Sequence, residues 1–256
     1  LDLLSRCIAS IETYTTYPTY EIVIVDNDSV EQQTLDYFQH TPHRVIQFGG
    51  DFHFSRMMNA AVEQVSGNLI LFLNNDIEVL SAEWLNALVE QACRPEVGAV
   101  GTKLLYPNHA VQHAGVIIGL CEFAGHSHRH VSGFQHGYWG SIVIIRNYSA
   151  VTAACLMMRR SLFLEMDGFD EAFQYAYQDV DLCLRLRDKG LLSVYTPYAP
   201  LVHYESASRG GAMAFGGQDI ALARSRWHTY LSQGDPYYNP NLTHDSEDFS
   251  IAVGPS

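Results

Sequence analysis

The chain has 256 residues, of which 47% are hydrophobic and 17% are charged, and its formal net charge at pH 7 is −13. This length and apolar content suffice to form one large α/β domain with a sizeable core. The acidic balance argues against nucleic acid or an anionic membrane surface as the main partner, because both attract basic surfaces. The longest apolar runs are strand-sized, too short to span a membrane, and no signal peptide is recognisable.

The five cysteines are Cys7, Cys93, Cys121, Cys155 and Cys183, and no two of them have CxxC spacing. An odd number of scattered cysteines is typical of reduced thiols in a cytosolic protein. A disulfide framework or a zinc site is disfavoured.

Helix-like and strand-like segments alternate through the first hundred residues. The expected helices cover 1–11, 30–38, 55–65 and 82–91, and the expected strands cover 21–25, 44–48 and 68–73. Strands that alternate with helices predict parallel βαβ units. The expected fold is therefore α/β, with a mostly parallel central sheet flanked by helices.

The second half of the chain is less regular. Apolar runs predict strands at 97–105, 151–158 and 192–195, and helical patterns cover 160–166 and 180–189. Residues 115–140 are rich in Gly and His and are expected to form a long loop region. After residue 206 come a Gly-rich segment, one helix ending near Trp227 and an extended tail. No linker is evident, so residues 1–256 are expected to form a single domain.

Two polar segments, Asp26-Asn27-Asp28-Ser29 and Asn74-Asn75-Asp76, directly follow two of the expected strands. Ligands of open α/β sheets bind beyond the carboxyl ends of the strands, so we expect these strand ends to lie side by side at one rim. A carboxylate within an Asn/Asp cluster suits a hard divalent cation that bridges phosphate oxygens. Ordinary polar turns use the same residues, and neither segment by itself separates the two interpretations.

Asp179 and Asp181 open the helix that is expected to end near Gly190. Asp at a helix start is an ordinary cap. It can also act as a general base, since a helix N-terminus favours the ionised carboxylate. Residues that are two positions apart on a helix lie on different faces. We therefore expect only one of these two carboxylates to face a cleft.

Histidines mark two further candidate sites. His203 follows a strand and precedes Arg209, which lies in the Gly-rich segment and could clamp a diphosphate. A structural hydrogen bond for His203 and a solvated Arg209 are the alternatives. His126, His128 and His130 form an HxHxH pattern that would suit zinc in a hydrolase, although a solvated loop explains it equally simply.

Taken in order, the segments resemble bacterial family 2 glycosyltransferases, most closely the subgroup linked to O-antigen and rhamnan-type polysaccharide assembly. The resemblance covers most of residues 1–242. The stretches that carry it are EIVIVDNDS, FHFSRMMNAAVEQVSGNLILFLNNDIEV, GAVGTKLLYPNHAVQHAGVIIG, RNYSAVTAACLMMRRSLFLEMDGFDEAF, QDVDLCLRLRDKG, TPYAPLVHYESASRG and DPYYNPNL.

The resemblance implies a GT-A fold, a nucleotide-diphosphate sugar donor, Mn²⁺ or Mg²⁺, and inversion at the anomeric carbon. It implies a nucleotide-sugar-binding half at 1–105, an acceptor and catalytic half at 106–205, and a lid, helix and tail at 206–256. The implied acceptor is a hydroxyl of a glycan or lipid-linked glycan. The implied location is cytoplasmic, at the inner face of the membrane through other parts of the protein.

Carried over by position, the resemblance places Asp26 and Asn27 at the nucleoside and Arg209 at the diphosphate. Asp76 matches the last acid of the metal-binding motif, Asn74 and Asn75 precede it at the donor, and His203 matches a histidine that completes the metal site.

Asp179 matches the catalytic base of the family. Asn74 and Gln178 stand where relatives carry acids, so less negative charge surrounds the implied metal. The resemblance also implies a central strand before residue 1, and we expect a gap in the sheet where that strand would lie.

Three other functions are compatible with parts of the pattern. A catalytically silent sugar-nucleotide-binding or scaffold domain would account for the missing strand and the two neutral substitutions. A metal hydrolase would bind zinc through His126, His128 and His130. A nucleotidyltransferase is disfavoured, because the residues contain no basic, Gly-rich N-terminal phosphate loop.

Overall fold

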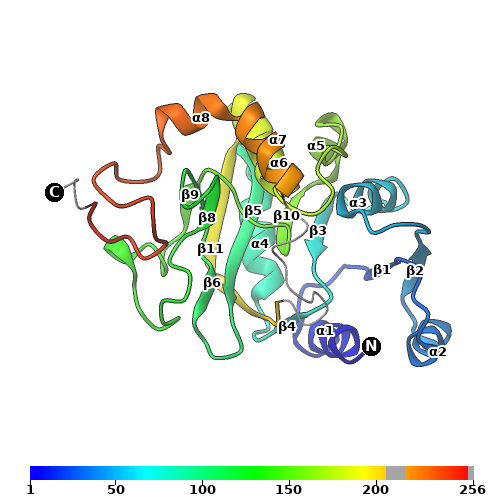
Figure 1. Cartoon of the computed structure of the whole chain (residues 1–256). Coiled ribbons are helices and arrows are strands. Elements are labelled where there is room, and N and C mark those ends of the chain that lie inside the picture. The colour runs from blue at the N-terminus through cyan, green and yellow to red at the C-terminus, as the bar shows by residue number, and fades with distance from the viewer. Residues whose placement is uncertain (206–216, 253–256) are drawn as a thin grey trace.

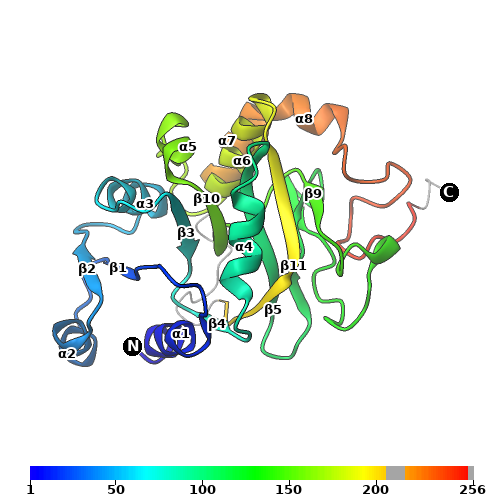
Figure 2. The ribbon, with the colours of Figure 1, turned by 180° about the vertical axis from the view of Figure 1, so that it is seen from behind.

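A computed structural model describes residues 1–205 and 217–252 of the chain. It shows a central sheet with helices on both faces (Figures 1 and 2). The helices are α1 (Asp2–Tyr14), α2 (Gln32–His40), α3 (Phe54–Glu63), α4 (Trp84–Ala92), α5 (Arg160–Glu165), α6 (Gln178–Asp188), α7 (Gly217–Arg226) and α8 (His228–Gln233). The strands are β1 (Val23–Asp26), β2 (Arg44–Gln47), β3 (Leu69–Leu73), β4 (Ile77–Val79), β5 (Val97–Leu105), β6 (Val111–His113), β7 (Val116–Ile118), β8 (Ala124–His126), β9 (Arg146–Tyr148), β10 (Cys155–Arg159) and β11 (Leu192–His203).

The main sheet has the strand order β3-β10-β5-β11-β4, with β6 added at β5 and β9 at β11. This arrangement confirms the α/β class with a helix-flanked central sheet. The strand directions are mixed: β5 and β11 run parallel, and the other neighbours in this sheet are antiparallel. Parallel neighbours need a long crossover, which residues 106–191 provide between β5 and β11.

The apolar side chains of the sheet belong to two hydrophobic cores, one on each face. In β3, Ile70 and Phe72 pack with residues of α5 and α6 on one face. Leu69, Leu71 and Leu73 pack on the other face, with the cluster formed by α1 and α4. Figure 2 shows α4 lying across the sheet on the side opposite to α6 and α7. Successive side chains of β3 thus point to opposite faces of the sheet, and each face packs against helices.

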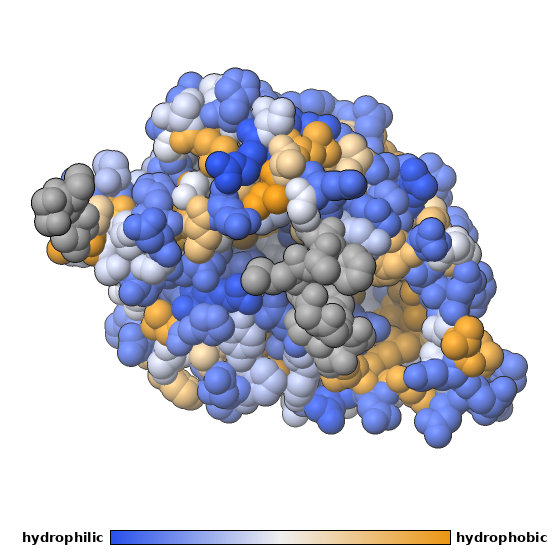
Figure 3. All heavy atoms as spheres, viewed as in Figure 1, coloured by the Kyte–Doolittle hydropathy of each residue, from blue (hydrophilic) through white to orange (hydrophobic). Residues whose placement is uncertain are grey.

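The sheet is interrupted between β1 and β3. β1 pairs in parallel with β2 in a separate two-stranded sheet, and in the described part of the chain neither β1 nor β3 has a strand on its other edge. Both strands border one cleft, and they are not hydrogen-bonded to each other. Apolar side chains line the cleft here, and apolar residues also show in this hollow in the space-filling view (Figure 3). The gap predicted from the resemblance lies at this place.

The second half contains more strand than the sequence predicted. β11 runs on to His203 rather than ending at Tyr195. A register irregularity between Thr196 and Leu201 accommodates Pro197 and Pro200, which a regular central strand would not tolerate. Within the expected loop region 115–140, β7 and β8 form an antiparallel pair.

All five cysteines are free, as predicted. In the described residues no helix is long and apolar enough to cross a membrane. The expected lid covers residues 210–217. It lies with Arg209 outside the described residues, except for Gly217 at the start of α7.

The unpaired edge of β1 generates a stability prediction. We expect backbone amides of β1 to exchange with solvent much faster than those of β5, because β5 is paired on both edges by β10 and β11. Native-state hydrogen exchange followed by NMR measures this difference. The Val25 amide faces the open edge, since its neighbours Ile24 and Asp26 are the residues whose backbone groups are directed to β2. Equal protection of Val25 and Val100 would contradict the open edge.

Candidate active site

A cleft of about 2280 Å³ runs from the gap between β1 and β3 to the carboxyl end of β11. Its size exceeds the roughly 300–1,000 Å³ of ordinary ligand pockets, because an apolar slot and a polar end are continuous. The polar end gathers side chains from segments far apart in the sequence. Those that the resemblance assigned to the donor, the metal or the base and that line the cleft are Asp26, Asn27, Asn74, Asn75, Asp76, Asp179 and His203.

The pairing of β11 with β4 brings Asp76 to His203. The antiparallel register places His203 opposite Ile77, and the Tyr204 amide donates to the Asp76 carbonyl at 2.9 Å. Asp76 Oδ1 and His203 Nε2 are 3.0 Å apart, and both side chains are buried. The two residues proposed as metal ligands therefore converge on one point.

Hydrogen bonds fix which nitrogen of His203 carries the proton. Gln112 Nε2–H donates to Glu205 at 3.1 Å, so Gln112 Oε1 is left as an acceptor 2.6 Å from His203 Nδ1. His203 therefore donates through Nδ1–H, and Asn74 Nδ2–H donates to its Nε2 at 3.2 Å. With its proton on Nδ1, His203 presents an unprotonated Nε2 that lies 3.0 Å from Asp76 Oδ1.

Asp76 and His203 fit a divalent cation. The buried Asp76 Oδ1 receives no hydrogen bond from any described residue. Two electron-rich atoms thus face each other with no proton between them, an arrangement that a cation would stabilise. No group of three or more His, Cys, Asp or Glu side chains in the described residues could hold a metal, so ligand oxygens would have to complete the shell.

An ion pair between Arg129 and Glu205 stabilises the orientation of Gln112, the residue that contacts His203. Arg129 lies 3.3 Å from Glu205, whose carboxylate holds the Gln112 amide. Burial acts to raise the pKa of Glu205, but the Arg129 charge and the Gln112 hydrogen bond outweigh it and lower the pKa. Glu205 is therefore ionised at neutral pH, and it keeps Gln112 oriented toward His203.

Asp26 and Asn27 lie at the carboxyl end of β1. The buried Asp26 carboxylate accepts hydrogen bonds from the Ser29 amide and hydroxyl. Asn27 Nδ2 donates to the carbonyls of Phe48 and Gly50, at 3.0 and 2.9 Å. The Asn27 amide thus holds the loop after β1 against the loop after β2, and its side-chain oxygen is left for a ligand.

Asp179 lies at the first turn of α6 and is partly buried. Its Oδ2 accepts from the Ala153 amide and its Oδ1 from the Val180 amide, each at 2.8 Å. Burial raises the pKa of Asp179 above its ordinary value, and these hydrogen bonds offset only part of the rise. The helix start therefore does not bring the pKa of this carboxylate below its ordinary value, because desolvation is the larger effect.

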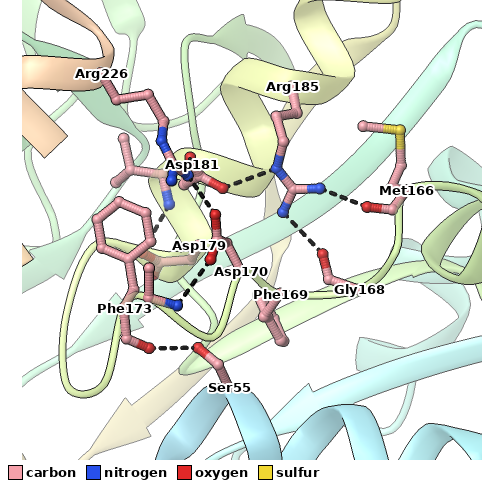
Figure 4. Close-up of polar contacts among 12 residues, drawn as sticks. Ser55, Met166, Gly168, Phe169, Asp170, Phe173, Asp179, Asp181, Arg185 and Arg226 are labelled. Carbon is pink, nitrogen blue, oxygen red and sulfur yellow. Dashed lines mark hydrogen bonds and ion pairs between the residues drawn. The ribbon is translucent and has the colours of Figure 1, made fainter. Parts of the chain in front are cut away.

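Asp181 is directed away from Asp179 (Figure 4). It is fully buried and lies 2.8 Å from both Arg185 and Arg226, and the Trp227 indole donates to it at 3.0 Å. Asp181 is therefore fully occupied in joining α6 to α7. Of the two acids at this helix start, only Asp179 lines the cleft.

The histidines of the HxHxH pattern do not converge. His128 is buried, accepts from the Tyr138 amide and stacks on Phe249. His130 stacks on Tyr106, whereas His126 Nδ1 lies 2.8 Å from His113 Nδ1. The zinc-hydrolase alternative is contradicted, since the three rings point to three different partners.

The sequence reasoning missed Gln112 and Glu205, which orient His203, and the cleft position of His126. The HxHxH pattern singled out His126 only as a candidate zinc ligand. Nothing in the local sequence marks Gln112 or Glu205, because the contact between them joins residues 93 positions apart.

Comparisons with known proteins agree on one class. Residues 1–164 match the family model described as glycosyl transferase family 2. The chain is 42% identical, over 99% of its length, to an O-antigen biosynthesis protein RfbC of Myxococcus xanthus, and covers 20% of that protein. It is 40% identical, over 98% of its length, to an uncharacterized protein of Sinorhizobium fredii, and covers 29% of it. The chain thus spans less than a third of these two relatives.

A third relative is N-acetylglucosaminyl-diphospho-decaprenol L-rhamnosyltransferase of Mycobacterium tuberculosis, 25% identical over 81% of this chain and 73% of that protein. Among solved structures, GalNAc-T7 with UDP, GalNAc and Mn²⁺ has a TM-score of 0.63, at 12% identity over 90% of this chain and 46% of that one. A mannosyltransferase from Pyrobaculum calidifontis with GDP-Man and Mn²⁺ has a TM-score of 0.57, at 15% identity over 82% and 55%. The fold of this chain is therefore of the GT-A type.

The orientation of His203 generates a metal-binding prediction. We expect Gln112→Leu to weaken Mn²⁺ binding by about 10–100-fold, because the substitution removes the acceptor that keeps the His203 proton on Nδ1. Electron paramagnetic resonance of free Mn²⁺ measures the affinity. The control is Gln135→Leu on the exposed surface, which should bind Mn²⁺ as the unsubstituted chain does. Unchanged affinity in Gln112→Leu would remove this support for the metal site.

Proposed function

Because this chain belongs to glycosyl transferase family 2, we propose that it transfers a sugar from a nucleoside-diphosphate donor to a hydroxyl group, with inversion at the anomeric carbon. One observation carries the proposal. A single cleft contains a carboxylate fit to act as a base, Asp179, and the converging pair Asp76 and His203.

Each group has a separate task in this proposal. Asp76 and His203 hold Mn²⁺ or Mg²⁺, which neutralises charge on the diphosphate leaving group when bound. Asp26 and Asn27 contact the nucleoside at the end of β1, and Asn74 and Asn75 contact the donor beside the metal. Arg209, outside the described residues, is assigned to the diphosphate by resemblance alone.

Asp179 takes the proton of the attacking hydroxyl as the new bond to the anomeric carbon forms. The bond from that carbon to the diphosphate oxygen breaks, and its electron pair leaves with the diphosphate. Attack from the side opposite to the leaving group inverts the anomeric centre. The raised pKa of Asp179 suits this task, since a base whose pKa lies nearer to the working pH accepts a proton more readily.

The proposed acceptor is a hydroxyl of a glycan or lipid-linked glycan. Two relatives support it by their names, one for O-antigen biosynthesis and one for transfer to a diphospho-decaprenol-linked sugar. A lipid-linked acceptor would place the reaction at the cytoplasmic face of a membrane, with other parts of the protein providing any membrane attachment.

The donor class is tested with a panel of nucleotide sugars, with and without Mn²⁺ or Mg²⁺. We expect one donor to stabilise the chain against heat in the presence of the cation, since a ligand that binds the native state raises its melting temperature. With that donor, NMR of the product should show the anomeric configuration opposite to that of the donor. Retention of configuration would refute the inverting mechanism.

The silent-domain alternative rests on the neutral Asn74 and Gln178 near the proposed metal and base. It predicts that a nucleotide sugar binds and that neither transfer nor donor hydrolysis follows. Slow hydrolysis of the bound donor that requires the cation would exclude it.

Asp179→Asn tests the base directly. We expect kcat to fall by about 10²–10⁴-fold with donor affinity retained, because the amide cannot accept the proton. The base must be ionised, so the rate of the unsubstituted enzyme should fall as the pH drops through a pKa above the ordinary 3.8. The residual activity of Asp179→Asn should lack this acid limb.

The matched control is Asp167→Asn, an exposed carboxylate away from the cleft, which should leave kcat and the pH profile unchanged. Near-normal turnover of Asp179→Asn would mean that another group is the base.

A further inference from the structure

A chain of two histidines leads into the cleft beside the proposed metal site. His113 ends β6 and is completely buried, and His126 ends β8 and lines the cleft. Their Nδ1 atoms are 2.8 Å apart, and the rings meet nearly edge to face, at 80°. Two unprotonated nitrogens would repel at this distance, so one Nδ1 carries a proton and the other accepts it.

The backbone decides which ring is the donor. The Gly115 amide donates to His113 Nε2 at 3.3 Å, so that nitrogen must present its lone pair. The neutral His113 ring therefore carries its proton on Nδ1 and donates it to His126 Nδ1. As a consequence, neutral His126 carries its own proton on Nε2.

Both rings are neutral at ordinary pH. Burial lowers the pKa of His113 well below its usual value and lowers that of His126 to about 4. The His126 backbone amide donates to Glu247 at 2.7 Å, which fixes the position of the ring along β8. His126 Nε2–H has no hydrogen-bond partner among residues 1–205 and 217–252.

The place of His126 in the cleft indicates what it meets. β8 pairs with β7, and Val116 of β7 exchanges backbone hydrogen bonds with Ala150, next to the segment whose Ala153 amide holds Asp179. His203 and Glu205 line this cleft as well, at the proposed metal pair. His126 thus lines the same cleft as the proposed base and the proposed metal pair. A sugar bound for transfer must have its anomeric carbon between these two groups.

We propose that His126 Nε2–H donates a hydrogen bond to a hydroxyl oxygen of the donor sugar and thereby helps to select and orient that sugar. This inference rests on the proposed function for the class of donor. A neutral, fixed N–H donor suits a neutral hydroxyl, and it requires a hydroxyl of correct position on the sugar ring.

The test uses His126→Phe, which keeps a flat ring without the donor, and His126→Gln, whose amide can place an N–H near the position of Nε2. Binding is measured in the presence of Mn²⁺ for the nucleotide sugar identified by the panel and for its free nucleoside diphosphate. We expect His126→Phe to bind the nucleotide sugar about tenfold more weakly, the usual effect of one hydrogen bond, and the free diphosphate as the unsubstituted chain does. His126→Gln should recover most of the loss.

Monodeoxy donors identify the hydroxyl. For the hydroxyl that His126 contacts, the deoxy donor should bind the unsubstituted chain about tenfold more weakly and should bind His126→Phe no worse than the complete donor does. Independently, ¹⁵N NMR of the ring should show the proton of His126 on Nε2. His228→Phe, on the exposed surface of α8, controls for loss of a histidine.

Three results would overturn the inference. They are a proton on His126 Nδ1, an equal loss of affinity for the free diphosphate, or unchanged binding of the nucleotide sugar by His126→Phe. None of these results concerns turnover. A chain that binds donor selectively through His126 but transfers nothing would refute the proposed transfer and leave this inference standing.

Discussion

The pairing of β11 with its neighbours is the constraint on which the rest of the structure depends. β11 runs parallel to β5 at the centre of the sheet and pairs with β9 near its start and with β4 near its end. The irregularity around Pro197 and Pro200 lets one strand pair with β9, β5 and β4 along its length. Next to the irregularity, the Thr102 hydroxyl donates to the Ala199 carbonyl at 2.6 Å and lies 3.1 Å from the Thr196 carbonyl. His203 is consequently delivered to Asp76 by backbone pairing, before any ligand binds.

Three aspartates show how environment divides tasks among identical side chains. Asp76 is buried with an oxygen that no described donor satisfies, so it is suited to a cation. Asp181 is buried between two guanidinium groups and an indole, so its charge is already neutralised. Asp179 accepts backbone amides and still lines the cleft, with a pKa raised by burial. Of the three, Asp179 is the one that we propose as the base.

Two short hydrogen-bond relays set the proton positions of the cleft histidines in opposite ways. Gln112 draws the His203 proton to Nδ1, so that Nε2 presents a lone pair toward Asp76. His113 donates to Nδ1 of His126, so that Nε2 of that ring presents a proton to the cleft. The same type of side chain is thus suited to ligate a cation through a lone pair at one place and to donate a hydrogen bond at the other. In both cases a buried neighbour that does not line the cleft, Gln112 or His113, sets the position of the proton.

The sequence by itself determined the α/β class, the helices of the first hundred residues, the strands β1, β2 and β3 and the polar strand ends, because these depend on local periodicity and local turn chemistry. It also placed Asp76, Asp179 and His203 in a family pattern whose members meet in one cleft here. It did not predict β4, the short strand that pairs with the end of β11. It could not determine the full length of β11, the small β7–β8 sheet or the direction in which the pKa of Asp179 shifts. Those depend on register and desolvation, which arise only when distant segments pack. For the same reason, only the tertiary structure revealed Gln112, Glu205 and the His113–His126 contact, since their partners are chosen by strand pairing and not by neighbours in the chain.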